Sequence, residues 1–405
     1  MYKRQRLAWE FEDGSDERVM HRRYPILYHQ TYAEMLPADG GFLLCRAGTW
    51  GSQAWTRVIW PGDLDASFAR HGEQDTNRDG ETYTAVGGLP AAVSASMSLG
   101  PSGFPLFASD TGGYRHSPPD KELFMRWFQH TALTAVMQIG TSTNDVAWET
   151  TEDNGFDEEL LNVYREYTRL HLRLFPMLWS YAQALLRDGR PIVRALGLVY
   201  PELGVHPDDT YMLGDHLLVA PVIERGARER SLMLPAGRFI HWFDDTIIEG
   251  PGELTVPAPL DRLPLYLAEG GVVPMLRPTI DTLSPTDTPD TVDSFAEDPG
   301  LLYARVFPGP TSVFELYDGG TIEQSATDGG ARLTWTPGDV FTQGLLVELL
   351  GVDGFSESIK LNDAALNEVA SLAALESSPS PGWVEEAGHL WVRLPASGGE
   401  VVFER

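Results

Sequence analysis

A carboxylate follows an apolar run at residues 58–63, which read Val-Ile-Trp-Pro-Gly-Asp. The apolar residues predict a buried strand, and the Pro-Gly pair predicts a tight turn that leaves Asp63 just beyond the end of that strand. A carboxyl group beside a large aromatic ring suits general acid catalysis, because apolar surroundings raise its pKa toward neutral pH. Asp63 is therefore a candidate catalytic acid, although an Asp after a strand more often caps a helix.

Two tryptophans and an arginine lie near Asp63 in the sequence. Trp50 and Trp60 offer flat aromatic faces of the kind that stack on the C–H faces of sugar rings. Arg46 carries a planar guanidinium whose fork can hold paired hydroxyls or a carboxylate. These residue types predict a sugar-binding site, while tryptophans in the hydrophobic core are the commoner alternative.

These residues lie among apolar runs that alternate with helical periodicity. The apolar runs are at residues 42–46, 58–63, 105–110 and 135–139, and helical patterns fill intervals at 89–99 and 120–131. Apolar strands separated by helices are typical of a parallel sheet covered on both faces, in a barrel or a doubly wound fold. Neither GxGxxG nor GxxxxGK(S/T), the glycine-rich motifs of nucleotide-binding proteins, occurs in the turns of this region. In a barrel the carboxyl ends of the strands share one rim, so we expect Arg46, Asp63 and Asp110 to converge there.

The flanking and C-terminal regions read as helices followed by strands. Residues 21–36 predict a helix with Pro25 near its start, and residues 157–187 predict a helix that Pro176 breaks. From about residue 193, short apolar runs alternate with Gly, Pro and Asp turns, which is an all-β pattern.

A proline-rich stretch completes the predicted domain organisation. Residues 278–300 contain four prolines and no Lys or Arg, as expected of a junction between two β units. We therefore predict a partial (β/α)8 barrel, a proximal β domain, a linker-like junction and a distal β domain, at residues 1–200, 201–277, 278–300 and 301–405.

Charge and cysteine content exclude several classes of protein. The 405 residues include 58 acidic and 30 basic side chains, which give a net charge of −28. A field of this sign repels a nucleic-acid backbone, and the simpler interpretation is that the charge only favours solubility. Cys45 is the single cysteine, which excludes an intrachain disulfide and a CxxC metal site. We expect no metal, no nucleic-acid or membrane partner and, because no leader or long apolar stretch is visible, a cytoplasmic location.

Several blocks along the chain together match one family pattern. Residues 46–53 read Arg-Ala-Gly-Thr-Trp-Gly-Ser-Gln, residues 59–63 read Ile-Trp-Pro-Gly-Asp, and residues 102–114 read Ser-Gly-Phe-Pro-Leu-Phe-Ala-Ser-Asp-Thr-Gly-Gly-Tyr. Further blocks lie at residues 122–129, 214–222, 234–237 and 262–271. In order and content, over roughly residues 15–320, they resemble glycoside hydrolase family 31.

The resemblance implies a fold and a role for each site residue. The implied fold is α/β plus all-β, with the C-terminal half of a (β/α)8 TIM barrel followed by two antiparallel β-sandwich domains. Asp63 falls on the general acid/base and Trp60 on an aromatic subsite wall, while Arg46 and Asp110 fall on hydroxyl-binding positions. The implied reaction is hydrolysis of α-linked glycosides with retention, on an oligosaccharide or glycoside substrate and without a cofactor.

The catalytic nucleophile is the first departure from the family pattern. The family carries it on the barrel strand before Arg46, whereas residues 6–16 read as the loop after that strand. We therefore expect the chain to be truncated at its N-terminus and the nucleophilic Asp to be missing upstream of its start. Asp13 and Asp16 read as solvated loop carboxylates rather than as substitutes.

The eighth barrel strand holds the second departure. Gln138 stands where the family commonly has an Arg-x-His motif, so Gln138, Asn144 or Trp148 is expected to replace one hydroxyl contact. With Trp50, Gln138 joins the expected substrate-binding residues, and the sugar, the linkage and the oligomeric state stay open. A non-catalytic carbohydrate-binding relative or an inactive fragment is the alternative. We expect this chain alone to be inactive and poorly soluble, because half a barrel leaves sheet edges unpaired.

Overall fold

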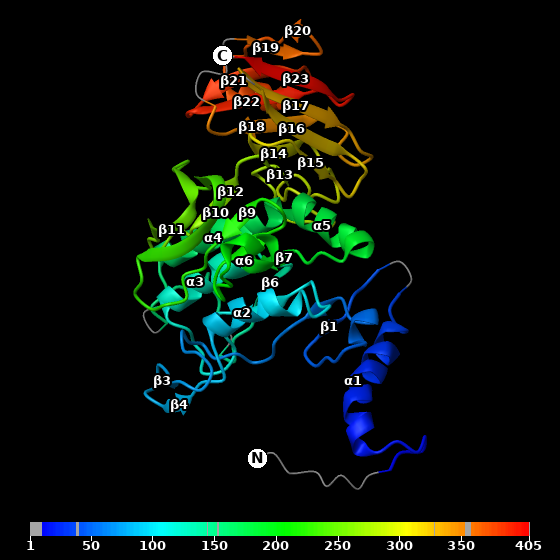
Figure 1. The fold of residues 1–405 in the computed structure, drawn as a ribbon, viewed down its shortest axis with the longest axis vertical. Coiled ribbons are helices and arrows are strands. Elements are labelled where there is room, and N and C mark those ends of the chain that lie inside the picture. The colour runs from blue at the N-terminus through cyan, green and yellow to red at the C-terminus, as the bar shows by residue number, and fades with distance from the viewer. Residues whose placement is uncertain are drawn as a thin grey trace.

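The computed structural model describes residues 10–37, 40–143, 145–151, 154–327, 329–352 and 358–404. The chain runs from helix α1 (Glu17–Ala33) at one end of the molecule, through a layer of helices and short strands, to stacked β-sheets at the other end (Figure 1). No helix among these residues is long and apolar enough to cross a membrane.

Four short parallel strands form the framework of the N-terminal region. β1 (Leu44–Cys45) pairs with β2 (Val58–Ile59), and β5 (Ala108–Thr111) pairs with β6 (Val136–Ile139). A parallel bridge joins the last residue of β2 to the residue just before β5. The four strands therefore lie in sequence order and point the same way, so their carboxyl ends meet along one edge.

Helices follow three of these strands, β2, β5 and β6, and begin where their sequences dictate. The helices here are α2 (Leu89–Leu99), α3 (Lys121–Thr131), α4 (Glu158–Arg173) and α5 (Phe175–Asp188). Asp120 and Asp157 cap α3 and α4 by accepting hydrogen bonds from backbone N–H groups of the first turn. The break predicted at Pro176 lies at Leu174, because proline fits the first turn of the second helix.

Helix α1 differs from its prediction at both ends. Asp16 caps it by accepting from the N–H of Val19, so it begins before residue 21. Pro25, predicted near the start, therefore lies inside the helix. The helix stands apart from the main body (Figure 1), and the rings of Tyr28 and Tyr32 on it are about half exposed.

The C-terminal region consists of three sheets. The six-stranded sheet has the order β11-β10-β12-β9-β8-β7, the five-stranded sheet has β13-β14-β18-β22-β21, and a second six-stranded sheet has β15-β16-β17-β23-β19-β20. The first contains β7 (Val193–Ala195), β8 (Tyr211–Leu213), β9 (Leu217–Val219), β10 (Glu229–His241), β11 (Ile247–Pro257) and β12 (Leu265–Ala268). The five-stranded sheet contains β13 (Gly271–Met275), β14 (Leu302–Phe307), β18 (Leu345–Leu349), β21 (Gly382–Glu386) and β22 (His389–Leu394). The third contains β15 (Ser312–Glu315), β16 (Thr321–Thr327), β17 (Gly330–Thr336), β19 (Ser358–Leu361), β20 (Ala364–Ala365) and β23 (Gly399–Glu404).

Minor elements are the 3-10 turns η1 (Ser52–Ala54) and η2 (Pro201–Leu203), the short helices α6 (Leu196–Val199) and α7 (Leu372–Ser377), and the hairpin β3 (Gln74–Thr76) and β4 (Thr82–Thr84).

Strand pairing in these sheets is mostly antiparallel, with one exception to the predicted pattern. β14 and β18 run parallel, because three strands of the third sheet, β15, β16 and β17, lie between them in the sequence and return the chain to the same end. Pairing also crosses two predicted boundaries: β7 joins β8, and β13 joins β14 across residues 278–300. The boundaries at residues 200, 277 and 300 stay predictions.

A buried arginine connects the helical layer to the β region. Arg126 of α3 is 1% exposed, and its guanidinium donates to the carbonyl oxygens of Ala227, Ala258, Pro259 and Arg262. Desolvation lowers its pKa to about 10. The two regions are thus joined by polar contacts as well as by apolar packing.

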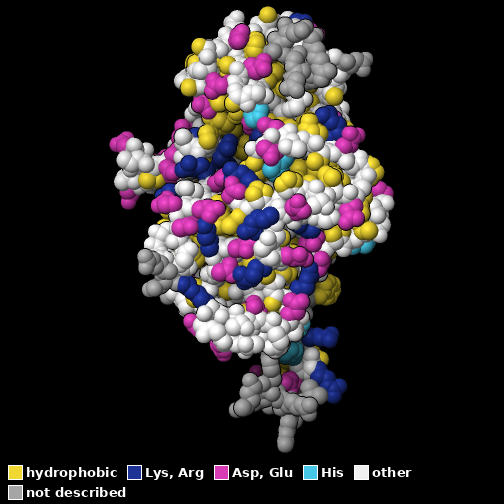
Figure 2. Space-filling model, turned by 90° about the vertical axis from the view of Figure 1, so that its left-hand side faces the viewer, with side chains coloured by type: hydrophobic (Ala, Val, Ile, Leu, Met, Phe, Trp, Pro, Cys, Tyr) yellow, Lys and Arg dark blue, Asp and Glu magenta, His cyan; other side chains and the backbone are white. Residues whose placement is uncertain are grey.

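Acidic and basic side chains intermix over the middle of the face in Figure 2, so the net negative charge is not gathered there.

Candidate active site

The strand ends deliver the predicted side chains to one place. Arg46 directly follows β1, and Trp60 and Asp63 follow β2. Asp110 lies within β5 and Gln138 within β6. Because the four strands are parallel and adjacent, these residues all belong to the same edge of the framework.

Asp110 is the hub of this group. The indole N–H of Trp60 donates to Oδ2 of Asp110 at 3.0 Å, and the side-chain amide of Gln138 donates to Oδ1 at 2.9 Å. Asp110 is 7% exposed, and burial raises the pKa of its carboxyl, against the opposing effect of these two hydrogen bonds. Each carboxylate oxygen keeps a further lone pair, so Asp110 can still accept from a hydroxyl group.

Arg46 links Trp60 to Asp63. Its guanidinium carbon lies 5.0 Å from the centre of the Trp60 ring, and its Nη2 lies 3.3 Å from Oδ2 of Asp63. The turn between them requires glycine: Gly62 has φ of 93°, and a Cβ there would lie 2.9 Å from Nε of Arg46. The Pro-Gly turn that the sequence predicts therefore places the Asp63 carboxylate against the guanidinium.

A second glycine permits the approach of Asp110 to β6. A Cβ on Gly140 would lie 2.3 Å from Oδ1 of Asp110, which is the oxygen that accepts from Gln138. The absence of a side chain at residue 140 is thus a condition for the Asp110–Gln138 contact.

The group combines buried and accessible polar atoms. The side chains of Arg46 and Asp63 are 57% and 29% exposed, so both are open to a molecule from solvent. An accessible carboxyl can exchange a proton with a bound oxygen, and the guanidinium can donate to hydroxyls beside it. The arrangement suits a polyhydroxylated ligand held against an aromatic ring.

The remaining predicted residues lie outside this group. Trp50 is 85% exposed, and within the described ranges no hydrogen bond, ion pair or ring contact joins it to the residues above. The ring of Trp148 packs near Tyr164, with centroids 6.0 Å apart. Asn144 lies outside the described residues.

The two N-terminal carboxylates have local structural roles. Asp13 accepts hydrogen bonds from both the backbone and the hydroxyl of Ser15 and pairs with Arg23 at 2.7 Å. The Ser15 hydrogen bonds lower the pKa of Asp13. Asp16 caps α1, as described above. Residues 6–9 of the stretch expected to follow the nucleophile lie outside the described residues.

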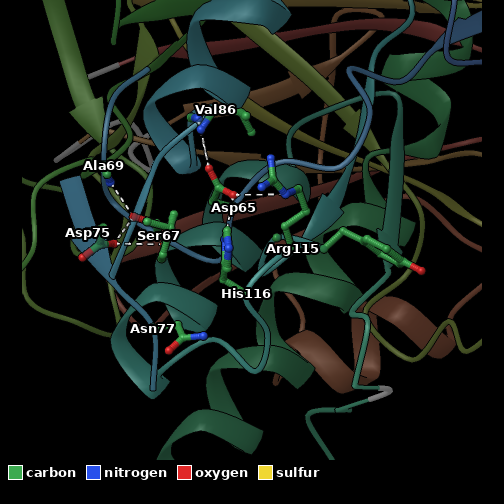
Figure 3. A network of polar contacts seen from close by, with 12 residues as sticks. Asp65, Ser67, Ala69, Asp75, Asn77, Val86, Arg115 and His116 are labelled. Carbon is green, nitrogen blue, oxygen red and sulfur yellow. Dashed lines mark hydrogen bonds and ion pairs between the residues drawn. The ribbon is translucent and has the colours of Figure 1, made fainter. Parts of the chain in front are cut away.

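Sequence reasoning missed a polar network beside the group. Its centre is Asp65, which contacts Val86, Arg115 and His116 (Figure 3). The β3–β4 hairpin, also missed, lies next to it. The Asp-Gly pair at residues 79–80 was a usable hairpin signal, since this dipeptide favours tight β turns.

Comparisons with known proteins agree on one family. A family model described as the glycosyl hydrolases family 31 TIM-barrel domain matches residues 2–181, and the C-terminal domain model of the same family matches residues 189–273. The isomaltosyltransferase of Sporosarcina globispora is 28% identical over 280 residues, which are 65% of this chain and 24% of that protein. The alpha-xylosidase of Saccharolobus solfataricus is 27% identical over 286 residues, which are 68% of this chain and 34% of that protein.

A solved structure shares the fold. The cycloalternan-forming enzyme from Listeria monocytogenes, solved in complex with a pentasaccharide substrate, matches with a TM-score of 0.81 at 21% identity. The match covers 98% of this chain and 37% of that one. The chain thus spans well under half of the length of these proteins.

Proposed function

This chain belongs to glycosyl hydrolase family 31, and from that premise we propose that it carries the acid/base half of the active site of a retaining glycosidase acting on α-linked glycosides. Asp63 is the general acid/base in this proposal. Arg46, Trp60, Asp110 and Gln138 bind the sugar.

One observation carries the proposal. An accessible carboxylate, a guanidinium, an indole ring and a buried carboxylate come from three strands, β1, β2 and β5. They are joined in one chain of contacts from Asp63 through Arg46 and Trp60 to Asp110. Gly62 and Gly140 leave room for Arg46 and Asp110, because a Cβ at these two residues would lie 2.9 Å from Nε of Arg46 and 2.3 Å from Oδ1 of Asp110.

The proposed reaction assigns each group a task. Trp60 supports one face of the sugar ring, and Arg46 and Asp110 hold its hydroxyls. The Asp63 carboxyl gives its proton to the glycosidic oxygen as the bond to the anomeric carbon breaks. Its carboxylate then takes a proton from the water that releases the glycosyl enzyme. Arg46 stabilises that carboxylate through the 3.3 Å ion pair.

The nucleophile belongs, in this proposal, to a part of the protein outside this chain. In retaining glycosidases the two carboxyl groups lie about 5–5.5 Å apart. Asp13 and Asp16 are occupied by Ser15, Arg23 and the first turn of α1, which argues against either of them in that role. In this proposal the chain comprises the C-terminal half of the catalytic barrel followed by two β-sandwich domains, and the N-terminal half of the barrel carries the nucleophile.

The substrate class in the proposal is an oligosaccharide or glycoside. The amide of Gln138 is committed to Asp110 in place of the usual histidine contact, so the glucoside preference common in the family does not transfer automatically. Alpha-xylosides, alpha-galactosides and modified hexosides belong in the first substrate panel. The alpha-xylosidase among the relatives supports starting with xylosides.

The test is Asp63→Asn in the full-length protein. The kcat/KM for glycosides with poor leaving groups, which reports the step that breaks the glycosidic bond, should fall at least about 100-fold, the lower end of what general acid catalysis contributes. Aryl glycosides with activated leaving groups should lose far less, because they need no proton. Asp13→Asn is the control and should leave both rates unchanged.

Three other outcomes count against the proposal. Equal losses on both substrate types would remove Asp63 from the acid/base role. A loss in Asp13→Asn would move catalysis to the N-terminal loop. Saturable sugar binding by a wild-type protein without turnover would identify a carbohydrate-binding relative instead.

A further inference from the structure

Asp65 lies two residues after Asp63, and none of its side chain is exposed to solvent. Its Oδ2 accepts hydrogen bonds from the backbone N–H groups of Val86 at 2.6 Å and Gly87 at 3.2 Å. Its Oδ1 lies 2.9 Å from Nδ1 of His116. Figure 3 shows Val86 and His116 pointing at Asp65 from separate segments of the chain. A single buried carboxylate therefore joins the loop that follows β2 to two other loops.

The backbone around Asp65 is bound to the same two segments. The N–H of Asp65 donates to the carbonyl of Gly87 at 3.0 Å. The carbonyl of Leu64 accepts from the N–H of Arg115 at 3.0 Å, and the N–H of Ala66 donates to the carbonyl of Arg115 at 2.7 Å. The guanidinium of Arg115 also lies 3.7 Å from Oδ1 of Asp65. The side-chain and backbone contacts thus hold residues 64–66 at one position.

Two glycines show how closely these segments approach. A Cβ on Gly113 would lie 2.6 Å from the backbone nitrogen of Ala66, and a Cβ on Gly88 would lie 1.8 Å from the carbonyl oxygen of Ser67. Because backbone atoms occupy that space, neither position tolerates a side chain without movement of the loop.

The β3–β4 hairpin is fastened to the same place. The hydroxyl of Ser67 donates to the carboxylate of Asp75 on β3. The ring of Tyr83 on β4 stacks on His116, with centroids 3.5 Å apart and planes 16° apart. The imidazole that faces Asp65 is therefore itself covered by the hairpin.

Asp63 has no comparable support of its own. Among the described residues, its side chain makes one hydrogen bond or ion pair, the 3.3 Å contact with the mostly exposed guanidinium of Arg46. Its position must then come from the backbone on either side, which is β2 and Gly62 before it and residues 64–66 after it.

We infer that Asp65 is a positioning residue, which holds the loop after β2 so that the Asp63 carboxyl meets the glycosidic oxygen. The inference rests on the proposed function of Asp63 and adds a residue to it. A buried carboxylate is costly unless it is fully paired, and Asp65 has partners on both oxygens. The cost is placed next to the one group whose exact position acid catalysis depends on.

The test variant is Asp65→Asn, which keeps the shape of the side chain and removes its charge. The control is Asp293→Asn, which breaks the contacts of Asp293 with Arg277 and Thr279 in the C-terminal region. Amide hydrogen exchange is measured first and leaving-group dependence second, both in the full-length protein.

Two results are expected. In Asp65→Asn the amides of Ala66 and Arg115 should exchange at least about tenfold faster, while Asp293→Asn leaves them unchanged. In Asp65→Asn, kcat/KM for glycosides with poor leaving groups should fall at least about tenfold more than kcat/KM for activated aryl glycosides. A general loss of stability would lower both values equally.

Unchanged exchange at these amides would overturn the positioning role. So would equal losses on both substrate types in a variant whose exchange does rise. If the wild-type full-length protein turns over no glycoside, the proposed function fails on that observation, and the exchange measurement alone decides whether Asp65 holds the loop.

Discussion

The indole N–H of Trp60 and the carboxylate of Asp110 form a 3.0 Å hydrogen bond across fifty residues of sequence. The bond fixes the plane of the ring on which the Arg46 guanidinium rests, and it ties the loop after β2 to β5. The Trp60 ring is therefore oriented by a buried acid rather than by apolar packing alone.

Replacing Trp60 by Phe tests this relationship. The ring face remains, but Asp110 loses one of its two side-chain donors while it stays buried. An unpaired buried acceptor costs about 1–3 kcal/mol of stability. Sugar affinity should fall about tenfold because the ring face is no longer held in one orientation. Calorimetric titration of the full-length protein with its glycoside measures the affinity. Trp383→Phe is the matched control, because it also removes an indole hydrogen bond, the 3.1 Å contact with the carbonyl of Leu366 in the C-terminal region. Equal affinity losses in the two variants would contradict the assigned role.

A histidine between two acids makes stability depend on pH. Nε2 of His389 lies 2.6 Å from Asp245, and Nδ1 lies 2.6 Å from Glu348. The hydrogen bond to Glu348 and these charges raise the pKa of His389 to about 9. The folded state then holds a proton that the unfolded state releases near pH 6.5. The stabilisation is complete below pH 6.5 and disappears as pH rises through about 9.

Urea denaturation between pH 6 and 10 measures the effect. The free energy of unfolding should fall by about 1–2 kcal/mol over this range, less than full linkage because the ring is partly exposed. His389→Gln should flatten the curve in this window. A wild-type curve that rises with pH would show that the imidazole is not charged in the folded protein.

The buried guanidinium of Arg126 should be indispensable for stability. Arg126→Met leaves the carbonyls of Ala227, Ala258, Pro259 and Arg262 without this donor. Breaking such a buried network typically costs about 3–5 kcal/mol, which chemical denaturation measures. Arg169→Met is the control, since Arg169 is about half exposed and pairs with Asp281 at only 3.7 Å. Losses of similar size in the two variants would rule out the connecting role.

Local patterns were sufficient to predict most of the N-terminal elements. The face of α3 is apolar at helical spacing, and its residues Phe124, Trp127 and Phe128 are fully buried. The order of strand and helix follows from such runs because each element carries its own period. The direction in which two strands pair does not follow from such runs, because parallel and antiparallel strands have similar apolar patterns. The parallel pairing of β14 with β18 could therefore not be predicted from the sequence.

The site shows where prediction from residues ends. Asp63 and Arg46 have sequence neighbours that suggest their chemistry, and the structure brings them into contact. Asp65 and His116 meet across fifty-one residues, and nothing local to either one signals the other. Trp50 looks the same as Trp60 in sequence, and its 85% exposure depends on the fold around it.

The pairing of β13 with β14 also redraws the limits of a transferable module. β13 is the edge strand of its sheet, which is why Pro274 fits there without an N–H to offer. If C-terminal regions were exchanged between relatives at a cut inside residues 278–300, β13 would be lost from the sheet. The edge of β14 that pairs with β13 would then be exposed. A graft that is to stay soluble has to begin before Gly271 and carry the proline-rich loop, pinned by Arg277 to Asp293, as an internal part.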